Sequence, residues 1–513
     1  MKFKLLIISI ISFFLTCFLW IPYIFPYFSN VDEPGYFASA IQLSKGKLLY
    51  KDVFEAKGPA IMYIFKFFVK LFPSNFTFIY HFFMFLILFF NSFLIYKILN
   101  KKINSDFSLL GFFFSVFLSC FYPVDMITGP EIFVNFLLLL TYFILLYFSY
   151  LEVSLFLIGI FSGIFILFKP FGIFYIITFL ILIGIRKKLY GIILYIFGVI
   201  ILPCLFFYYL ISKEILKDFY LWTVEYPLFV SKTIPLWRKI YYFFPMIGRL
   251  FILNPFYIMF GLPLIFSKEE FKKYFDIIIL FVASLMWGAS HGLAFPHHYV
   301  MAIPFILILS IIGFYNFNNK FLKNRETKIV INLFIIFSVV QSLIYWNGFD
   351  FYKKWIEFIK EKKWSKEYEV KKHSEILNFL KENTKREDQI VIWGLNPKIY
   401  VLSGISPGTK FISSVEPVNG IVYYDVTKII QFKKAEDIFI EEIKKKDVKF
   451  FIDATFNSLI GIPYYTFDKY IEIKKVLDSE YQILPLTYSG CQIYKHRFTI
   501  SINNGNIFRK WKR

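Results

Sequence analysis

Residues 76–96 read FTFIYHFFMFLILFFNSFLIY and contain no Asp, Glu, Lys or Arg. About 20 such residues in a helix are enough to cross the hydrocarbon core of a bilayer. Comparable apolar runs occupy 5–25, 107–124, 131–150, 154–168, 171–185, 190–211, 242–266, 275–290, 299–315 and 329–346. The sequence therefore predicts a mainly α-helical membrane protein with about eleven spans. Lys169-Pro170 divides two short runs, which form either a hairpin or one broken helix.

The composition divides the chain into two parts. Of 513 residues, 58% are hydrophobic and 23% aromatic, and the mean hydropathy of +0.59 excludes both a disordered chain and an ordinary soluble enzyme. Residues 1–349 carry 28 Lys and Arg and 15 Asp and Glu, so about 12% of them are charged, against about 30% of residues 350–513. We expect a transmembrane domain over 1–349 and a soluble domain over 350–513.

The soluble part alternates helical and strand patterns. Residues 367–383 and 435–446 have the apolar spacing of amphipathic helices, while 389–393 and 448–452 are short apolar runs typical of buried strands. This alternation predicts a small α/β domain.

Basic residues in short loops indicate the topology. They are Lys97, Lys101 and Lys102; Arg186, Lys187 and Lys188; Lys268, Lys272 and Lys273; and Lys320, Lys323, Arg325 and Lys328. With a cytoplasmic N-terminus all four groups face the cytoplasm, as the positive-inside rule requires. An odd number of spans then puts 350–513 outside, together with loops 29–75, 125–131 and 291–298. The formal charge of +21 reflects this topology and not a nucleic-acid partner.

The first external loop contains two groups of polar residues. Asp32 and Glu33 precede Pro34, and a helix is expected over 34–44. Asp32 either caps that helix or acts as a general base at the membrane face, where carboxylates are costly unless solvated or paired.

The loop ends with Glu55, Lys57, Gly58 and Pro59, and a short interfacial helix follows over 60–72. Helix N-termini bind anions, and Gly58 would let a ligand approach the backbone. Lys57 either binds a phosphate there or snorkels to the membrane surface.

The other two external loops also carry candidate site residues. In the second loop, Asp125 and Glu131 compete as an acid of the site, and Glu131 can equally be a dipole partner of its helix. In the third loop, His297, His298 and Tyr299 lie together. These histidines either bind a divalent cation with the carboxylates or donate to a phosphate or an acceptor.

The order of these motifs resembles the GT-C superfamily of membrane glycosyltransferases. The shared features are Asp32-Glu33 after the first span, Asp52…Lys57-x-Pro59, an acid opening the fourth span, and a late His-Tyr pair followed by Pro304. The protein O-mannosyltransferases and the bacterial aminoarabinose-lipid A transferases are the most similar families. Segments 376–380, 388–394 and 397–404 look like the external domain of the bacterial members.

The resemblance implies a function and a role for each motif. The donor would be a polyprenyl-phosphate sugar, the acceptor a glycan, lipid or protein, and the location the bacterial cytoplasmic (inner) membrane. Asp32, with Glu33 beside it, takes the place of the family's catalytic base, and Lys57 that of the lysine that contacts the donor phosphate, with Gly58 replacing a proline. Glu131 or Asp125 would be the second-loop acid, and His298 and Tyr299 would lie near the donor phosphate or the acceptor.

Two other functions remain open from the sequence. A transporter or flippase of a lipid-linked sugar should carry its functional charges near the middle of the bilayer. Here most acids cluster at the external ends of spans, which favours the enzyme, although Lys169 and Arg249 lie within membrane depth. In a non-catalytic scaffold, Asp32 would be a helix cap only.

Overall fold

The computed structural model describes residues 32–103, 106–120, 129–186, 189–233, 254–290, 296–321, 366–394, 396–412, 416–419, 432–455, 470–488 and 490–497, with scattered residues between 14 and 28, 235 and 248, and 338 and 360. The predicted span 329–346 lies outside these residues except for Ser338, as does most of span 5–25. Asp125 and the C-terminal residues 498–513 also lie outside them.

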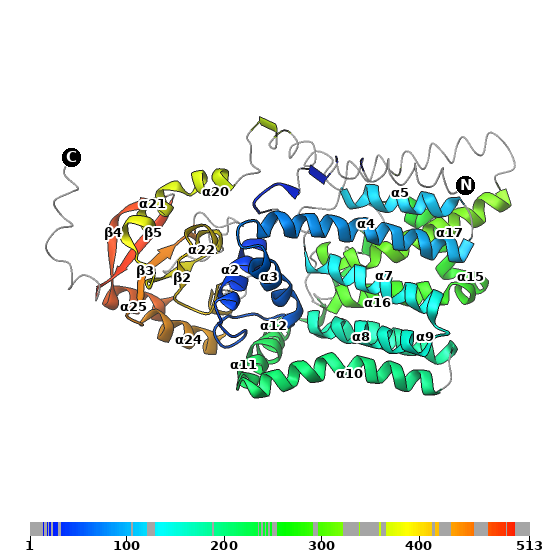
Figure 1. Ribbon diagram of the computed structural model, residues 1–513, viewed down its shortest axis with the longest axis horizontal. Coiled ribbons are helices and arrows are strands. Elements are labelled where there is room, and N and C mark those ends of the chain that lie inside the picture. Colours follow the sequence, from blue (N-terminus) through cyan, green and yellow to red (C-terminus); the bar gives the residue numbers. More distant parts are fainter. Residues whose placement is uncertain are drawn as a thin grey trace.

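Apolar helices form a bundle that makes up one end of the elongated molecule (Figure 1). They are α4 (Phe76–Ile103), α5 (Phe107–Cys120), α7 (Pro130–Phe148), α8 (Glu152–Phe168), α9 (Ile173–Arg186), α10 (Leu189–Ser212), α16 (Phe275–Ser290) and α17 (Ile303–Phe321). Among the described residues, four segments are long and apolar enough to cross a membrane: Phe76–Ile103, Glu131–Phe148, Leu189–Ser212 and His298–Lys320. The predicted multi-span helical fold is confirmed.

The short runs on either side of Lys169 form a hairpin. A 3-10 turn, η1 (Pro170–Gly172), connects α8 to α9. At this turn the Lys169 Nζ lies 2.7 Å from the Glu131 Oε1 at the start of α7. Arg186, at the other end of α9, binds Asp276 at the start of α16 instead. The end of α7, from which the chain enters α8, lies at this same end of the bundle, where the Tyr147 hydroxyl donates to the Lys97 carbonyl oxygen over 2.8 Å. Because α8 starts at this end and α9 returns to it, the two are antiparallel helices and not one broken helix.

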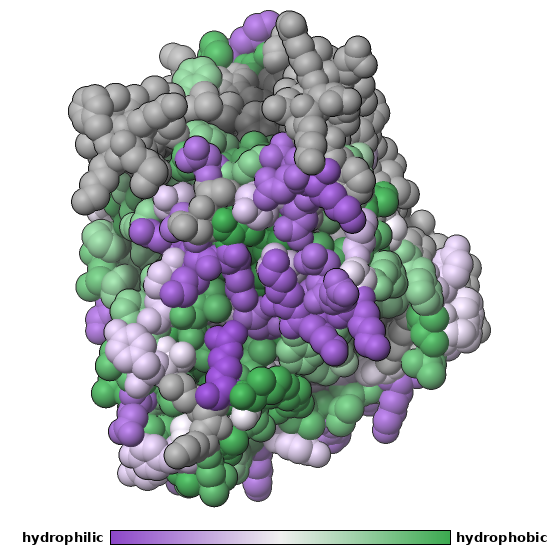
Figure 2. Space-filling view, turned by 90° about the vertical axis from the view of Figure 1, so that its right-hand side faces the viewer, coloured by the Kyte–Doolittle hydropathy of each residue, from purple (hydrophilic) through white to green (hydrophobic). Residues whose placement is uncertain are grey.

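The described residues of the basic clusters include Lys102, Arg186 and Lys320, at the ends of α4, α9 and α17, and these helix ends lie farthest from the soluble domain (Figure 1). There the Asp276 Oδ2 lies 2.7 Å from both the Lys102 Nζ and the Arg186 Nη2, which ties α4, α9 and α16 together. Helix α15 (Lys268–Lys273) lies beside the end of α17, where the Asn316 Nδ2 donates to the Glu270 Oε2 over 3.1 Å. Figure 2 shows this face, with hydrophilic side chains at its centre and hydrophobic ones around them. The positive-inside prediction requires the basic loops to lie on one face of the membrane, and the described basic residues share one face of the bundle.

Short helices lie between the bundle and the soluble domain (Figure 1). They are α2 (Glu33–Ser44), α3 (Pro59–Leu71), α11 (Leu216–Tyr220), the π-helical turn η2 (Leu221–Glu225) and α12 (Tyr226–Thr233). A second π-helical turn, η3 (Tyr257–Gly261), continues into α14 (Leu262–Phe266) within the predicted span 242–266. Helices α2 and α3 begin as predicted, because Pro34 and Pro59 stand in their first turns.

The C-terminal part is the predicted small α/β domain. Its helices are α20 (Lys366–Lys372), α21 (Ser374–Asn383), α22 (Lys398–Ser403), α23 (Glu416–Asn419), α24 (Lys433–Ile443) and α25 (Ile471–Glu480). Its strands are β1 (Gln389–Trp393), β2 (Ser406–Pro407), β3 (Val448–Asp453), β4 (Tyr481–Tyr488) and β5 (Cys491–His496). These described strands form one sheet in the order β2-β1-β3-β5-β4, with β1 parallel to β2 and β3 and with β5 antiparallel to β3 and β4. The predicted helix 367–383 is broken at His373.

Candidate active site

Asp32 is exposed at the start of α2 and does not cap the helix through its side chain. Asp32 therefore occupies the N-cap position of α2 without the side-chain hydrogen bond that the capping interpretation implied. Its carboxylate is close enough to Lys57, Lys169 and Glu55 to interact with each electrostatically. Asp32 thus shares one charged environment with the lysine at the end of the first loop, although the two residues are separated by all of α2.

Lys57 is held from several sides. The Glu55 Oε1 accepts hydrogen bonds from the backbone N–H groups of Ala56 (3.0 Å) and Lys57 (3.1 Å). The Tyr50 hydroxyl donates to the Lys57 carbonyl oxygen over 3.1 Å. The Lys57 ammonium donates to the Tyr36 hydroxyl and lies 4.7 Å from the centroid of that ring. These contacts fix both the backbone and the ammonium group of Lys57.

The loop that carries Lys57 has an unusual backbone. Tyr50, which is fully buried, has φ +71°, a conformation that residues other than glycine seldom adopt. Glu55 is also buried, and its side chain is used to hold the turn at Lys57. Glu55 is therefore a support for Lys57 in this structure and not a second exposed acid.

Gly58 packs against the end of α8 and not against open space. Its N–H donates to the carbonyl oxygen of Phe168 over 3.1 Å, and a Cβ at this position would lie 2.1 Å from the carbonyl oxygen of Leu167. The expectation that Gly58 lets a ligand approach the backbone is therefore wrong. The glycine instead lets the first loop contact the turn between α8 and α9, which brings Lys57 close to Lys169.

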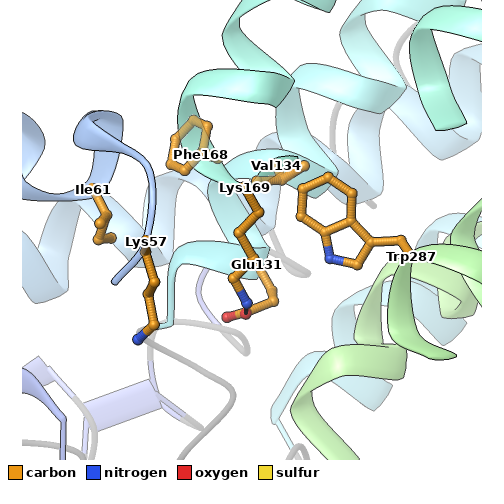
Figure 3. A pocket seen from close by; sticks show the side chains of 7 residues that line it. All are labelled: Lys57, Ile61, Glu131, Val134, Phe168, Lys169 and Trp287. Atoms are coloured by element: carbon orange, nitrogen blue, oxygen red, sulfur yellow. Dashed lines mark hydrogen bonds and ion pairs between the residues drawn. The ribbon is translucent and has the colours of Figure 1, made fainter. Parts of the chain in front are cut away.

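A small cavity lies between the first loop and the bundle (Figure 3). It is lined by Lys57, Ile61, Glu131, Val134, Phe168, Lys169 and Trp287. Figure 3 shows Lys57, Lys169 and Glu131 reaching this space from three different segments. Two ammonium groups and one carboxylate belong to the lining residues, and the carboxylates of Asp32 and Glu55 are close enough to Lys57 to interact with it electrostatically.

Glu131 is at the site as the sequence predicted, but its partner was not predicted. It pairs with Lys169 over 2.7 Å, and both side chains are buried. The signal for Lys169 was in the sequence, since a lysine between two apolar runs is rare without a functional or structural reason. The sequence alone indicated only that Lys169 lies within membrane depth and did not indicate a role for it.

The His-Tyr pair lies behind the cavity wall. His298 and Tyr299 belong to the 3-10 helix η4 (Pro296–Ala302), and both are buried. The Tyr299 ring packs against Gly288, where a Cβ would lie 3.0 Å from the ring. Gly288 directly follows the lining residue Trp287 in the chain. Neither His298 nor Tyr299 is among the lining residues. The side chain of His297 lies outside the described part of the chain.

Glu33 points away from the exposed position of Asp32. It is fully buried, and its Oε2 lies 3.0 Å from the Nε2 of His81 on α4. His81 was missed at the sequence level because a single histidine within an apolar span gives no signal of its partner.

Within the described residues, no three His, Cys, Asp or Glu side chains lie close enough together to hold a metal ion. The predicted divalent cation is not tested by this finding, because Asp125, His291 and the side chain of His297 lie outside those residues.

Comparison with known proteins identifies the fold. No family model and no curated protein matches the sequence. Among solved structures, ArnT from Cupriavidus metallidurans in the apo state matches with a TM-score of 0.56 and 10% identity, covering 96% of this chain and 98% of that one. The same protein bound to undecaprenyl phosphate matches with a TM-score of 0.58 and 10% identity, covering 94% and 97%. The chain therefore has the multi-span helical fold of ArnT over nearly its whole length.

Proposed function

We propose that this protein is a glycosyltransferase that moves a sugar from a polyprenyl-phosphate carrier to an acceptor at the external face of a bacterial cytoplasmic membrane. The observation that carries the proposal is the grouping of the exposed Asp32 with Lys57 and Lys169 beside one cavity at the end of an apolar bundle. Two lysines beside an apolar bundle suit a carrier that has a phosphate on a hydrophobic chain. The match to ArnT, which has been solved with undecaprenyl phosphate, supports this class of carrier.

Asp32 would act as the general base. Its carboxylate takes the proton of the acceptor hydroxyl as the acceptor oxygen bonds to the anomeric carbon. The bond between that carbon and the phosphate oxygen breaks, and its electron pair leaves with the lipid phosphate. One direct displacement inverts the anomeric configuration, as in the two-sided chemistry of inverting glycosidases.

Lys57 and Lys169 would stabilise the leaving group. The carrier phosphate gains one negative charge when the sugar leaves, so cations fixed beforehand favour the transition state over the ground state. Tyr36 and Glu55 hold Lys57 in place, while Glu131 does the same for Lys169. Little reorganisation of these side chains is then needed during the reaction.

The test is incubation of the purified protein with undecaprenyl-phosphate-linked glucose, mannose or aminoarabinose, with membranes as the acceptor source. We expect release of undecaprenyl phosphate from at least one donor, and its loss in Asp32→Asn. Release unaffected by Asp32→Asn, or no release from any donor, would contradict the proposal. Parallel reactions with EDTA test the divalent cation, and a reporter fused at residue 350 tests the external location of the soluble domain.

A further inference from the structure

We infer that Glu33 and His81 form a buried pair that positions Asp32 and takes no part in proton transfer. The inference rests on the proposed role of Asp32 as the base. Glu33 directly follows Asp32 in the chain, and its carboxylate meets the His81 Nε2 at 3.0 Å. The side chains of Glu33 and His81 are 0% and 1% exposed. The acid adjacent to the proposed base is thus sealed inside the protein.

The contacts of His81 define how many protons the pair holds. The His81 Nδ1 lies 3.2 Å from the carbonyl oxygen of Ile24, which can only accept a hydrogen bond, so the Nδ1 carries a hydrogen. The Nε2 then either donates to a Glu33 carboxylate as part of an imidazolium or accepts from a protonated Glu33. In both states the pair has no net charge, which is how two ionisable groups tolerate full burial.

The pair joins three segments next to the site. Ile24 belongs to the first predicted span, Glu33 begins α2, and His81 lies in the second turn of α4. Because adjacent Cα atoms are about 3.8 Å apart, holding Glu33 also sets the position of the Asp32 backbone. A catalytic group displaced by about 1 Å can lose about 100-fold in rate, so this anchor matters for turnover.

The soluble domain closes the other side of the same turn. The Lys398 Nζ of α22 binds the Glu369 Oε1 at 3.0 Å, and Lys398 interacts electrostatically with Glu33. The Lys398 ammonium also lies 5.4 Å from the ring centroid of Phe28, just before the loop. The first turn of α2 is therefore enclosed between α4 and α22, while Asp32 stays exposed at its start.

The decisive experiment compares Glu33→Gln with Glu33→Asp. Glutamine keeps the length of the side chain, and its amide can donate to a neutral Nε2 while the Nδ1–H stays on Ile24. Aspartate keeps the ionisable carboxyl but withdraws it by one methylene from His81. A positioning role predicts that Glu33→Gln keeps kcat within about threefold, while Glu33→Asp loses about 10-fold or more.

The assay is release of undecaprenyl phosphate from the donors named above, with binding of undecaprenyl phosphate measured in parallel. We expect His81→Ala and Glu33→Ala to lower kcat without weakening binding more than about twofold, and the double variant to be no worse than either single variant. Ser92→Ala is the matched control on α4. The Ser92 hydroxyl is buried and donates to the Leu88 carbonyl oxygen, yet it lies far along the helix from His81. The control should have normal kcat.

Two results would overturn the inference. If Glu33→Gln is as inactive as Asp32→Asn while Glu33→Asp is active, Glu33 takes part in proton transfer. If Glu33→Asp and His81→Ala both keep full kcat, the pair does not position the base. Both results require a wild-type protein that releases the carrier, so they are distinct from failure of the proposed function, in which the wild type is itself inactive.

Discussion

The backbone N–H of Phe54 donates a hydrogen bond to the carbonyl oxygen of Lys410, 2.9 Å away, and so joins the first loop to the soluble domain. The Phe54 ring is buried, and its centroid lies 5.4 Å from that of Phe411 and 5.0 Å from that of Trp222. Phe54 comes three residues before Lys57. The soluble domain therefore helps to hold the loop that carries the proposed phosphate-binding lysine.

We expect Phe411→Ala to weaken binding of undecaprenyl phosphate about 10-fold, which corresponds to about 1.4 kcal/mol. Removal of the Phe411 ring leaves Phe54 without one of its packing partners, so the first loop is less ordered in the free protein. Binding must then order the loop, and this entropic cost lowers the affinity. Titration of the purified variant with undecaprenyl phosphate measures the change.

Lys434→Ala is the control for Phe411→Ala. Lys434 pairs with Glu225 across the same junction, but the two side chains are 59% and 35% exposed. Such exposed pairs contribute at most about 1 kcal/mol, so binding should be nearly unchanged. Equal effects of the two variants would show that the aromatic contact has no special role.

We expect Lys169→Met to lower the melting temperature strongly, because it leaves the Glu131 carboxylate buried without its cation. Breaking one partner of a buried pair costs about 3–5 kcal/mol. The double variant Lys169→Met/Glu131→Gln should recover most of the stability. Its affinity for undecaprenyl phosphate should nevertheless stay below that of the wild type. Normal binding by the double variant would exclude Lys169 from the phosphate site.

Gly58→Ala should reduce both stability and turnover. The added Cβ would meet the carbonyl oxygen of Leu167 at 2.1 Å, so the loop or the end of α8 must move. Gly184→Ala is the control, since the nearest atom to its Cβ would be 3.8 Å away in ordinary contact. Melting temperature and carrier release measure both variants, and a Gly58→Ala protein with normal values would contradict the packing described here.

The sequence predicted the parts of this structure that depend on local patterns. Apolar runs identified the spans, and the positions of Pro34 and Pro59 identified the starts of α2 and α3. Sequence reasoning could not identify the Glu33–His81 pair or the contact between Phe54 and Phe411. Each of these joins residues that are 48 or more positions apart, and no local pattern records which distant residue a side chain will meet.

The role predicted for Gly58 was wrong because it, too, depends on a contact with a distant part of the chain. A glycine before a helix is compatible with anion binding, with a turn or with close packing. Only the position of α8, more than 100 residues later in the chain, decides among these roles. By contrast, the proximity of Asp32 and Lys57 followed from the order of motifs, because both belong to one loop at one face of the bundle.

We expect Glu55→Gln to change how stability depends on pH. Burial raises the pKa of the Glu55 carboxyl above its ordinary value of 4.5, although Lys57 and two backbone hydrogen bonds act in the opposite direction. Above pH 4.5 the folded protein therefore binds more protons at this site than the unfolded chain, and stability falls as pH rises through the raised pKa.

Glutamine can still accept the two backbone hydrogen bonds but does not ionise. The melting temperature of Glu55→Gln relative to the wild type should therefore rise as the pH increases from 4.5 through the raised pKa. A difference that is constant across this range would indicate an unperturbed carboxyl.

The most direct test of the account compares Asp32→Asn with Lys57→Ala in the same two assays, binding of undecaprenyl phosphate and its release from a sugar-linked donor. If Asp32 is the base and Lys57 binds the phosphate, Asp32→Asn should bind the carrier normally and release none, whereas Lys57→Ala should lose binding. Normal binding by Lys57→Ala, or normal release by Asp32→Asn, would contradict the account.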